Sequence, residues 1–130
     1  MKKQDKIDKI IGGVSLNLKY PIVLVHGMGF RDRKKYQVYW GRVPKMYRKM
    51  GAEVYFGGQD STGAPETNAR QVGDAIDEVL SRTGAEKVNV IAHSKGGLDT
   101  KYMITELSME DKIASLTTLC TPHKGSVIAS

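Results

Sequence analysis

Apolar residues follow two alternating patterns along this chain, short continuous runs and longer segments with helical spacing. The short runs are rich in β-branched residues and are bounded by turn residues, which is typical of buried strands. They cover 20–27, 52–56, 87–92 and 114–120. The segments between them predict helices over 40–50, 65–84 and 96–109. The order β-α-β-α-β-α-β predicts an α/β fold, a parallel sheet with flanking helices.

The chain has the length and composition of one globular domain or of a part of one. It has 130 residues, of which 40% are hydrophobic and 26% charged, and this excludes collagen, coiled coil and wholesale disorder. The charged, weakly patterned residues 1–19 are expected to form an arm, and 20–130 a partial domain. A single cysteine, Cys120, excludes an internal disulfide framework. We expect Cys120 to be a buried strand residue rather than a metal ligand together with His123, and we expect no metal site.

Positive charge is concentrated in residues 31–50, which contain eight basic side chains and one acid. Such a segment can dock on an anionic lipid surface, or it can be a solvated loop and helix face. Nucleic acid is not expected, because neither stacking aromatics nor a groove-reading motif accompanies the charge. The first ten residues start like the basic region of a signal peptide, but neither an apolar region nor a cleavage site follows. The sequence as written therefore predicts a cytoplasmic chain.

The junction between the third strand and the third helix carries the candidate chemistry. It reads Ala92-His93-Ser94-Lys95-Gly96, the nucleophile-elbow pattern G-x-S-x-G with alanine in the first position. Small residues are needed there because the chain turns sharply from strand to helix and holds the serine in a strained conformation. The alternative is that Ser94 only caps the helix. The position after a buried strand and before a helix favours a nucleophilic Ser94.

A second glycine-rich segment follows the first strand and reads His26-Gly27-Met28-Gly29. In a parallel sheet it emerges at the same edge as Ser94, and its glycines free the backbone to direct N–H groups toward a ligand. We assign the oxyanion hole to the backbone N–H groups of Met28 and Lys95. A dinucleotide motif is excluded, because G-x-G-x-x-G would need glycine where Asp32 stands.

Three blocks of the sequence resemble the bacterial triacylglycerol lipases of the α/β-hydrolase superfamily. They are Tyr20-Pro-Ile-Val-Leu-Val-His-Gly27, Lys87-Val-Asn-Val-Ile-Ala-His-Ser-Lys-Gly-Gly97 and Leu116-Thr-Thr-Leu-Cys-Thr-Pro-His-Lys-Gly-Ser126. The resemblance implies a lipase-type ester hydrolase that acts on acyl esters without a cofactor, and it usually implies secretion. It implies Ser94 as nucleophile and Met28 and Lys95 as oxyanion donors. The residues expected to support them are Ala92, His93, Gly96, His26 and Gly27.

The acid and the histidine of a Ser–His–Asp triad follow the elbow well downstream in this superfamily. Three histidines are present, but His93 is expected to point away from Ser94, His26 belongs to the oxyanion loop, and no acid is placed to orient His123. Asp99 is expected to be a solvated or packing helix residue. The sequence therefore predicts a hydrolase truncated to about four strands, whose last strand is an unpaired, apolar edge prone to self-association.

Other functions stay open at this stage. One is a different serine acyl hydrolase of the same architecture, such as a thioesterase or an acyltransferase. Another is a remnant without activity, or a module that binds lipid surfaces through residues 31–50.

Overall fold

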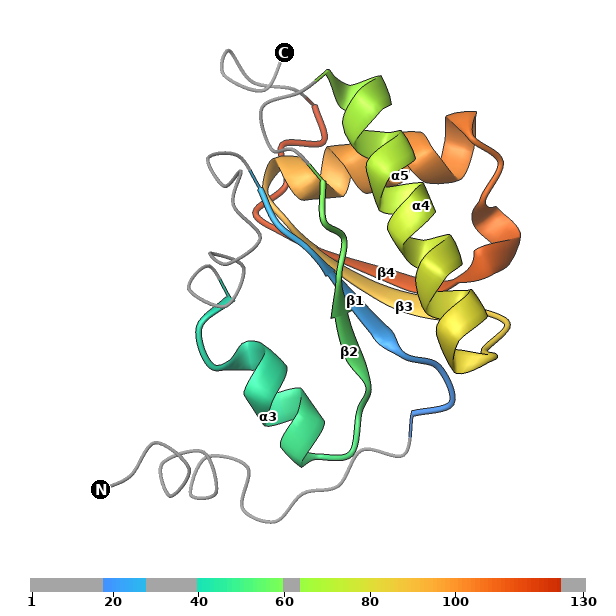
Figure 1. The fold of residues 1–130 in the computed structure, drawn as a ribbon. Helices are drawn as coiled ribbons and strands as arrows, with labels where there is room; N and C mark the ends of the chain where they lie inside the picture. Colours follow the sequence, from blue (N-terminus) through green and yellow to red (C-terminus); the bar gives the residue numbers. More distant parts are fainter. Residues whose placement is uncertain (1–17, 28–39, 60–63, 125–130) are drawn as a thin grey trace.

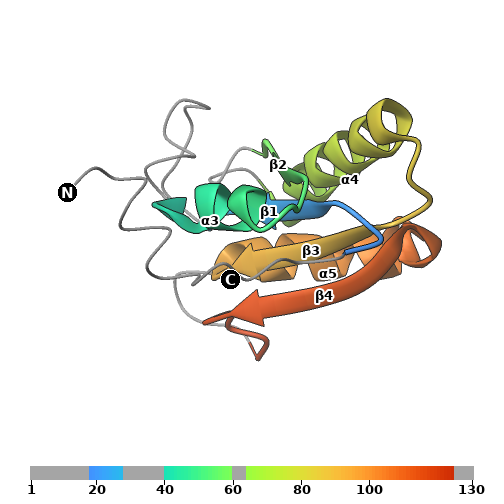
Figure 2. The ribbon, with the colours of Figure 1, turned by 90° about the horizontal axis from the view of Figure 1, so that it is seen from below.

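The strands form one parallel sheet, as the sequence predicts. The computed structural model describes residues 18–27, 40–59 and 64–124 (Figure 1). Within them the sheet has the order β2-β1-β3-β4, and all three pairings are parallel. The strands, which lie side by side in Figure 2, are β1 (Ile22–Val25), β2 (Val54–Phe56), β3 (Val88–His93) and β4 (Ile113–Leu119).

The described α-helices fall in the predicted segments, although the first begins later and the last ends earlier than predicted. They are α3 (Val43–Lys49), α4 (Pro65–Thr83) and α5 (Lys95–Glu106), and the 3₁₀ turn η2 (Glu110–Lys112) follows. Helix α4 starts with Pro65 and Glu66, and it ends at Gly84, whose φ of 73° places it in the left-handed region. Helix α5 ends before the predicted residue 109, because Ser108 has a φ of 53° and turns the chain into η2.

The two faces of the sheet are covered by different helices. In Figure 1, α4 and α5 lie on one side of the sheet and α3 on the other. Val23 and Val25 of β1 join the core under α4 and α5, while Ile22 and Leu24 join the core under α3. All four residues of β1 are buried, as its unbroken apolar run predicts.

The strands away from β1 are less covered. In β3, buried and half-buried residues alternate, so one face is fully covered. In β4 no residue is fully buried, and Leu119 is 45% exposed. Within the described residues β4 pairs only with β3, so it is the edge strand that the sequence predicts, and its side chains are a mixture of apolar residues with serine and threonine.

One expectation about the described residues is wrong, and others concern residues that the structure does not describe. Cys120 was expected to be a buried strand residue, and this is wrong: it is exposed and follows the end of β4 with a φ of 54°. The arm up to residue 17, Met28 and residues 31–39 of the basic segment lie outside the described residues. None of the described helices combines the length and the apolarity that crossing a bilayer requires.

Candidate active site

Ser94 lies at the turn between β3 and α5 in a backbone conformation that is rare for a residue with a side chain. Its φ is 56° and its ψ is −129°, a conformation that costs roughly 1–3 kcal/mol and persists only where the surroundings hold it. This is the strained turn that the elbow pattern predicts. Ser94 occupies the N-cap position of α5, yet its side chain makes no capping hydrogen bond. The capping alternative therefore does not account for a serine at this position.

The carboxyl end of β1 lies directly against the first turn of α5. A Cβ atom on Gly96 would come within 2.7 Å of the carbonyl oxygen of Val25 and still closer to that of His26. Only glycine allows this approach, because the obstructing atoms are backbone. This tight contact is with the end of β1. Ala92, the other small residue of the pattern, is fully buried. The structure thus brings His26 and Gly27 beside the elbow.

A buried ion pair lies on the first turns of α5. Lys95 Nζ donates a hydrogen bond to Asp99 Oδ1 at 2.9 Å, and the two side chains are 8% and 2% exposed. Burial raises the pKa of the Asp99 carboxyl, while Lys95, His26 and a hydrogen bond from Asn68 of α4 act in the opposite direction. Asp99 is a packing residue, and the alternative of a solvated position is wrong.

His26 is held at the end of β1 by contacts on both its ring and its backbone. Its Nδ1 donates to the carbonyl oxygen of Gly27 at 2.8 Å, and Gln59 Nε2 donates to the carbonyl oxygen of His26 at 2.7 Å. Burial lowers the pKa of the imidazole, so the ring favours its neutral form. No pattern in the sequence singled out Gln59, which follows β2 and is 1% exposed.

The chain that follows β4 also contacts the elbow. The N–H of Ser94 donates to the carbonyl oxygen of Leu119 at 2.8 Å. The hydroxyl of Thr121 donates to the carbonyl oxygen of Ser94, also at 2.8 Å. Sequence reasoning did not select Thr121, although its position in the third lipase-like block was a signal.

The other two histidines lie in different surroundings. The ring of His93 stands edge-on to Trp40, with ring centroids 6.4 Å apart, so it faces the α3 side of the sheet. His123 is exposed. Lys101 Nζ donates to its Nδ1 at 3.2 Å, and its Nε2 lies 3.1 Å from Thr118 Oγ1. Its ring nitrogens therefore contact an ammonium and a hydroxyl, neither of which can orient a general base as a carboxylate does.

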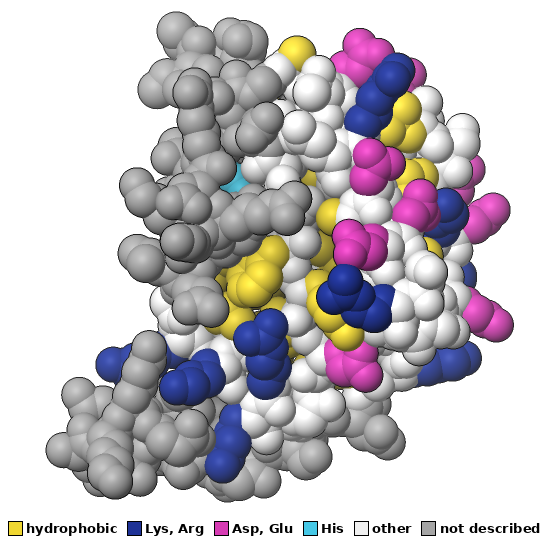
Figure 3. Space-filling model, viewed as in Figure 1, with side chains coloured by type: hydrophobic (Ala, Val, Ile, Leu, Met, Phe, Trp, Pro, Cys, Tyr) yellow, Lys and Arg dark blue, Asp and Glu magenta, His cyan; other side chains and the backbone are white. Residues whose placement is uncertain are grey.

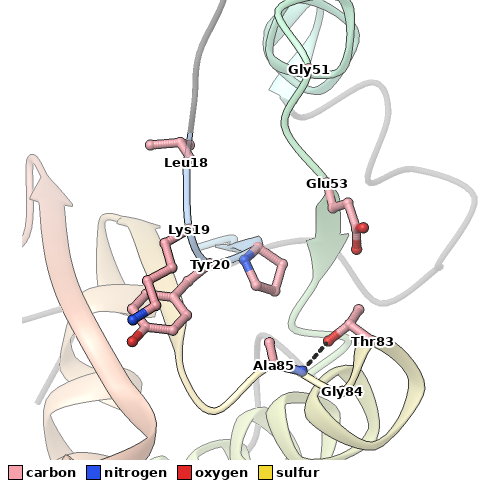
Figure 4. Close-up of a pocket in the computed structure, with 9 residues that line it drawn as sticks. Leu18, Lys19, Tyr20, Gly51, Glu53, Thr83, Gly84 and Ala85 are labelled. Carbon is pink, nitrogen blue, oxygen red and sulfur yellow. Dashed lines mark hydrogen bonds between the residues drawn. The ribbon is translucent and has the colours of Figure 1, made fainter.

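A shallow cavity of about 260 Å³ lies at the other end of the sheet (Figure 4). Its lining comes from the chain before β1, the approach to β2 and the end of α4, including Tyr20, Glu53 and Thr83. Ser94 follows the carboxyl end of β3, whereas this cavity borders the amino ends of β1 and β2. It is therefore separate from the candidate active site.

Solved structures of lipases share this fold. The mature form of a lipase from Bacillus licheniformis superposes with a TM-score of 0.75 at 23% identity, over 89% of this chain and 46% of that one. Lipase B from Aspergillus fumigatus superposes with a TM-score of 0.66 at 24% identity, over 91% and 28%. The fold is that of an α/β-hydrolase.

Sequence comparison narrows the class to a family. The chain belongs to the palmitoyl protein thioesterase family, whose model matches residues 21–129. It is similar to triacylglycerol lipases from Pseudarthrobacter phenanthrenivorans (37% identity) and Vibrio cholerae (36%), each over 85% of this chain. The predicted resemblance to bacterial lipases is confirmed. The chain spans 35% of the length of each of these two relatives.

Proposed function

We propose that this chain is the nucleophile-bearing part of a lipase-type carboxylic-ester hydrolase, with Ser94 as its nucleophile. The observation that carries the proposal is the backbone of Ser94, at φ 56° and ψ −129° between β3 and α5, with a side chain that does not cap the helix. Such strain persists only where the surroundings impose it, and it exposes the hydroxyl above the sheet. The similarity to triacylglycerol lipases supports the same reaction.

The reaction is acyl transfer. The hydroxyl oxygen of Ser94 attacks the ester carbonyl carbon as its proton passes to a general base. The carbonyl oxygen gains negative charge, which the backbone N–H groups of Lys95 and Met28 stabilise. The base then returns the proton to the departing alcohol, and an acyl-enzyme remains. Water then attacks the carbonyl carbon of the acyl-enzyme as its proton passes to the base. The base returns this proton to the oxygen of Ser94, and the carboxylic acid is released.

We propose that the general base and its acid are supplied by polypeptide outside these 130 residues. His26 is buried and bonded to Gly27, His93 faces Trp40, and His123 contacts Lys101. A triad histidine instead has one ring nitrogen oriented by a carboxylate and directs the other at the serine hydroxyl. The lipases similar to this chain are about two and a half times as long, because 85% of this chain matches 35% of each relative, and this leaves room for both residues.

The substrate class is an ester of an acyl chain with an alcohol. The names of the curated relatives favour triacylglycerol. A thioesterase is the second candidate, and it is favoured by the family whose model matches residues 21–129. Both substrates pass through the same acyl-enzyme on Ser94, so they differ in the leaving group and not in the nucleophile.

The test compares the chain with Ser94→Ala on two substrates of equal acyl length, p-nitrophenyl octanoate and an octanoyl thioester. Oxyanion donors and binding alone leave roughly 10³–10⁴-fold catalysis when triad residues are lost. We therefore expect the chain alone to release p-nitrophenol at most slowly, with or without the Ser94 hydroxyl, and to show no lipase-level turnover of triglyceride. Fusion to the relatives' remaining strands with their acid and histidine should restore turnover that depends on Ser94. Equal rates for the fusion and for the fusion that carries Ser94→Ala would refute the proposal, and a faster thioester reaction of the fusion would favour the second candidate.

Full Ser94-dependent lipase activity of the chain alone would mean that it contains its own base. His123 would then be the first residue to substitute, since it follows β4 near the elbow. In that case the proposal of an external base is wrong, while the role of Ser94 stands.

We also propose that the basic segment 31–50 contacts anionic lipid. Dark blue side chains gather in Figure 3 over the region where α3 lies in Figure 1, and Arg42 and Lys45 are exposed there. Arg48 is not available for this contact, because it donates to the carbonyl oxygen of Val54 at 2.7 Å and lies over Phe56. Arg42→Glu with Lys45→Glu should weaken sedimentation with phosphatidylserine vesicles, and should leave binding to phosphatidylcholine vesicles unchanged.

A further proposal concerns the edge of the sheet. Within the described residues β4 pairs only with β3, so its other side can add a strand from a second copy or from the missing part of the domain. We expect self-association that rises with concentration in light scattering. Thr117→Lys, at an exposed position, should reduce it. A sharp two-state melt of a monomer would contradict this proposal.

A further inference from the structure

The corner that follows β4, residues 119–123, contacts the elbow at both of the backbone polar groups of Ser94. The N–H of Ser94 donates to the carbonyl oxygen of Leu119, and the carbonyl oxygen of Ser94 accepts from the hydroxyl of Thr121, each at 2.8 Å. The same carbonyl oxygen accepts from the N–H of Gly97 at 3.1 Å. The orientation of the peptide units on either side of Ser94 is thus set from β4 as well as from α5.

Side-chain packing adds to these hydrogen bonds. A Cβ atom on Gly97 would lie 2.7 Å from Cγ2 of Thr121 and closer still to its Oγ1. The threonine side chain therefore rests directly on the backbone of α5 where Gly97 leaves space. Its methyl group packs at Gly97, and its hydroxyl bonds to Ser94. Serine would lack the methyl group, and valine would lack the hydroxyl.

The corner is itself fixed. Cys120 has a φ of 54°, which turns the chain so that Leu119 and Thr121 can both face Ser94. The N–H of His123 donates to the carbonyl oxygen of Thr121 at 2.9 Å. The ring of His123 contacts Lys101 of α5 and Thr118 of β4. The corner is therefore tied to both elements that flank it, and His123 has a structural role that needs no part in proton transfer.

We infer that Thr121 is a positioning residue that, through its hydroxyl, holds Ser94 in the strained conformation that acyl transfer requires. A non-glycine residue at φ 56° and ψ −129° relaxes unless its neighbours prevent it. The hydroxyl of Thr121 opposes that relaxation by fixing the carbonyl group of Ser94. This inference rests on the proposed role of Ser94, and it adds a residue that acts through Ser94 without touching the substrate.

The test uses Thr121→Val, which keeps the shape of the side chain and removes the hydroxyl, and Thr121→Ser, which keeps the hydroxyl. The matched control is Thr105→Val on the same helix as the elbow, where the lost hydroxyl donates to the carbonyl oxygen of Lys101. Each variant is made in the fusion that supplies the acid and the histidine, and is assayed for kcat and KM on p-nitrophenyl octanoate and for its rate of labelling by a fluorophosphonate.

A positioning role predicts a change in kcat without a change in KM. We expect Thr121→Val to lower kcat and the labelling rate about tenfold, which corresponds to one lost hydrogen bond and a small displacement of the nucleophile. Thr121→Ser and Thr105→Val should stay within about threefold of wild type. If Thr121→Val keeps its kcat while Ser94→Ala loses all activity, the inference is wrong and the proposed function stands.

Amide hydrogen exchange gives a readout that does not depend on activity. The N–H of Ser94, which is bonded to Leu119, should exchange about tenfold faster in Thr121→Val than in wild type and should be unchanged in Thr105→Val. If the fusion shows no Ser94-dependent reaction, the proposed function fails and this measurement alone decides the inference. Equal exchange in Thr121→Val and wild type would overturn it.

Discussion

Helices α4 and α5 pack on the same face of the sheet, and both carry oppositely charged residues four positions apart, yet the pairs lie in opposite environments. In α4, the pairs Glu66–Arg70 and Glu78–Arg82 have side chains that are 58% to 68% exposed. In α5, the pair Lys95–Asp99 is 8% and 2% exposed. The same spacing thus gives weak surface pairs on one helix and a desolvated pair beside the elbow on the other.

The two helices also start differently. Helix α4 starts with Pro65 after a residue in the extended region and has an acid in its first turn, as favourable helix starts do. Helix α5 starts after the strained Ser94 and has no acid in its first turn. The start of α4 thus has the features of a stable helix start, whereas the start of α5 carries the backbone strain of Ser94.

The largest expected effect comes from breaking the buried pair. Asp99→Ala should lower the free energy of unfolding by about 3–5 kcal/mol, because the Lys95 ammonium stays buried without its partner. Glu78→Ala, which breaks an exposed pair of α4, should leave it nearly unchanged. Urea denaturation followed by circular dichroism measures both. The double variant Lys95→Met with Asp99→Leu should recover most of the lost free energy of unfolding. An equal loss of this free energy in Asp99→Ala and in Glu78→Ala would contradict the difference between the two helices.

Substitution of the glycine at the start of α5 should destabilise the chain more than substitution of the glycine at the end of α4. Gly96→Ala should cost about 1–3 kcal/mol, because the new methyl group meets the backbone oxygens of Val25 and His26. Gly84→Ala at the end of α4 meets no neighbouring atom within 4 Å and is strained only by its φ of 73°, which costs about 1 kcal/mol. Thermal unfolding ranks the two, and the reverse order would contradict the close approach of β1 to α5.

Ser94→Gly should stabilise the chain. Glycine adopts the conformation of Ser94 without strain, and this gain of roughly 1–3 kcal/mol exceeds the entropic cost of glycine, so we expect a net gain of about 1 kcal/mol. Ser94→Ala keeps the Cβ atom and should show no such gain. Both variants lose the hydroxyl, so calorimetry on the pair separates the strain from the chemistry. A destabilised Ser94→Gly would mean that the turn is not strained.

The smallest effect is a pH dependence from His26. Burial lowers the pKa of His26 from 6.5, so below that pH the unfolded chain binds a proton that the folded chain resists. Stability therefore falls as the pH drops below 6.5, and His26→Asn should flatten this part of the profile. The raised pKa of Asp99 has the opposite slope above about 3.8, so the difference between wild type and His26→Asn isolates the imidazole. Urea midpoints at pH 7 and 5.5 measure it.

Most of the fold could be predicted from local patterns. The run Ile22–Val25 is buried on both faces as its unbroken apolar sequence indicates, and α4 starts at Pro65 and ends at Gly84 as predicted. The early end of α5 was missed, because Ser108 adopts a left-handed conformation that its residue type does not announce. Cys120 was misplaced for the same reason: its exposure depends on a turn that local hydrophobicity does not encode.

The sequence by itself determined the position of the candidate nucleophile, because the constraint at Ala92, Ser94 and Gly96 is local and steric. Only the tertiary structure decided what surrounds it. Gly96 contacts the end of β1, and Thr121 bonds to Ser94, so both contacts join segments that are distant in sequence. Lys95 and Asp99 lie on the same helix, but their burial depends on what covers them. Residue type and spacing fix which groups can bond along one helix or turn. Which groups come together across the sheet, and which charges lose their water, depends on how the whole chain packs.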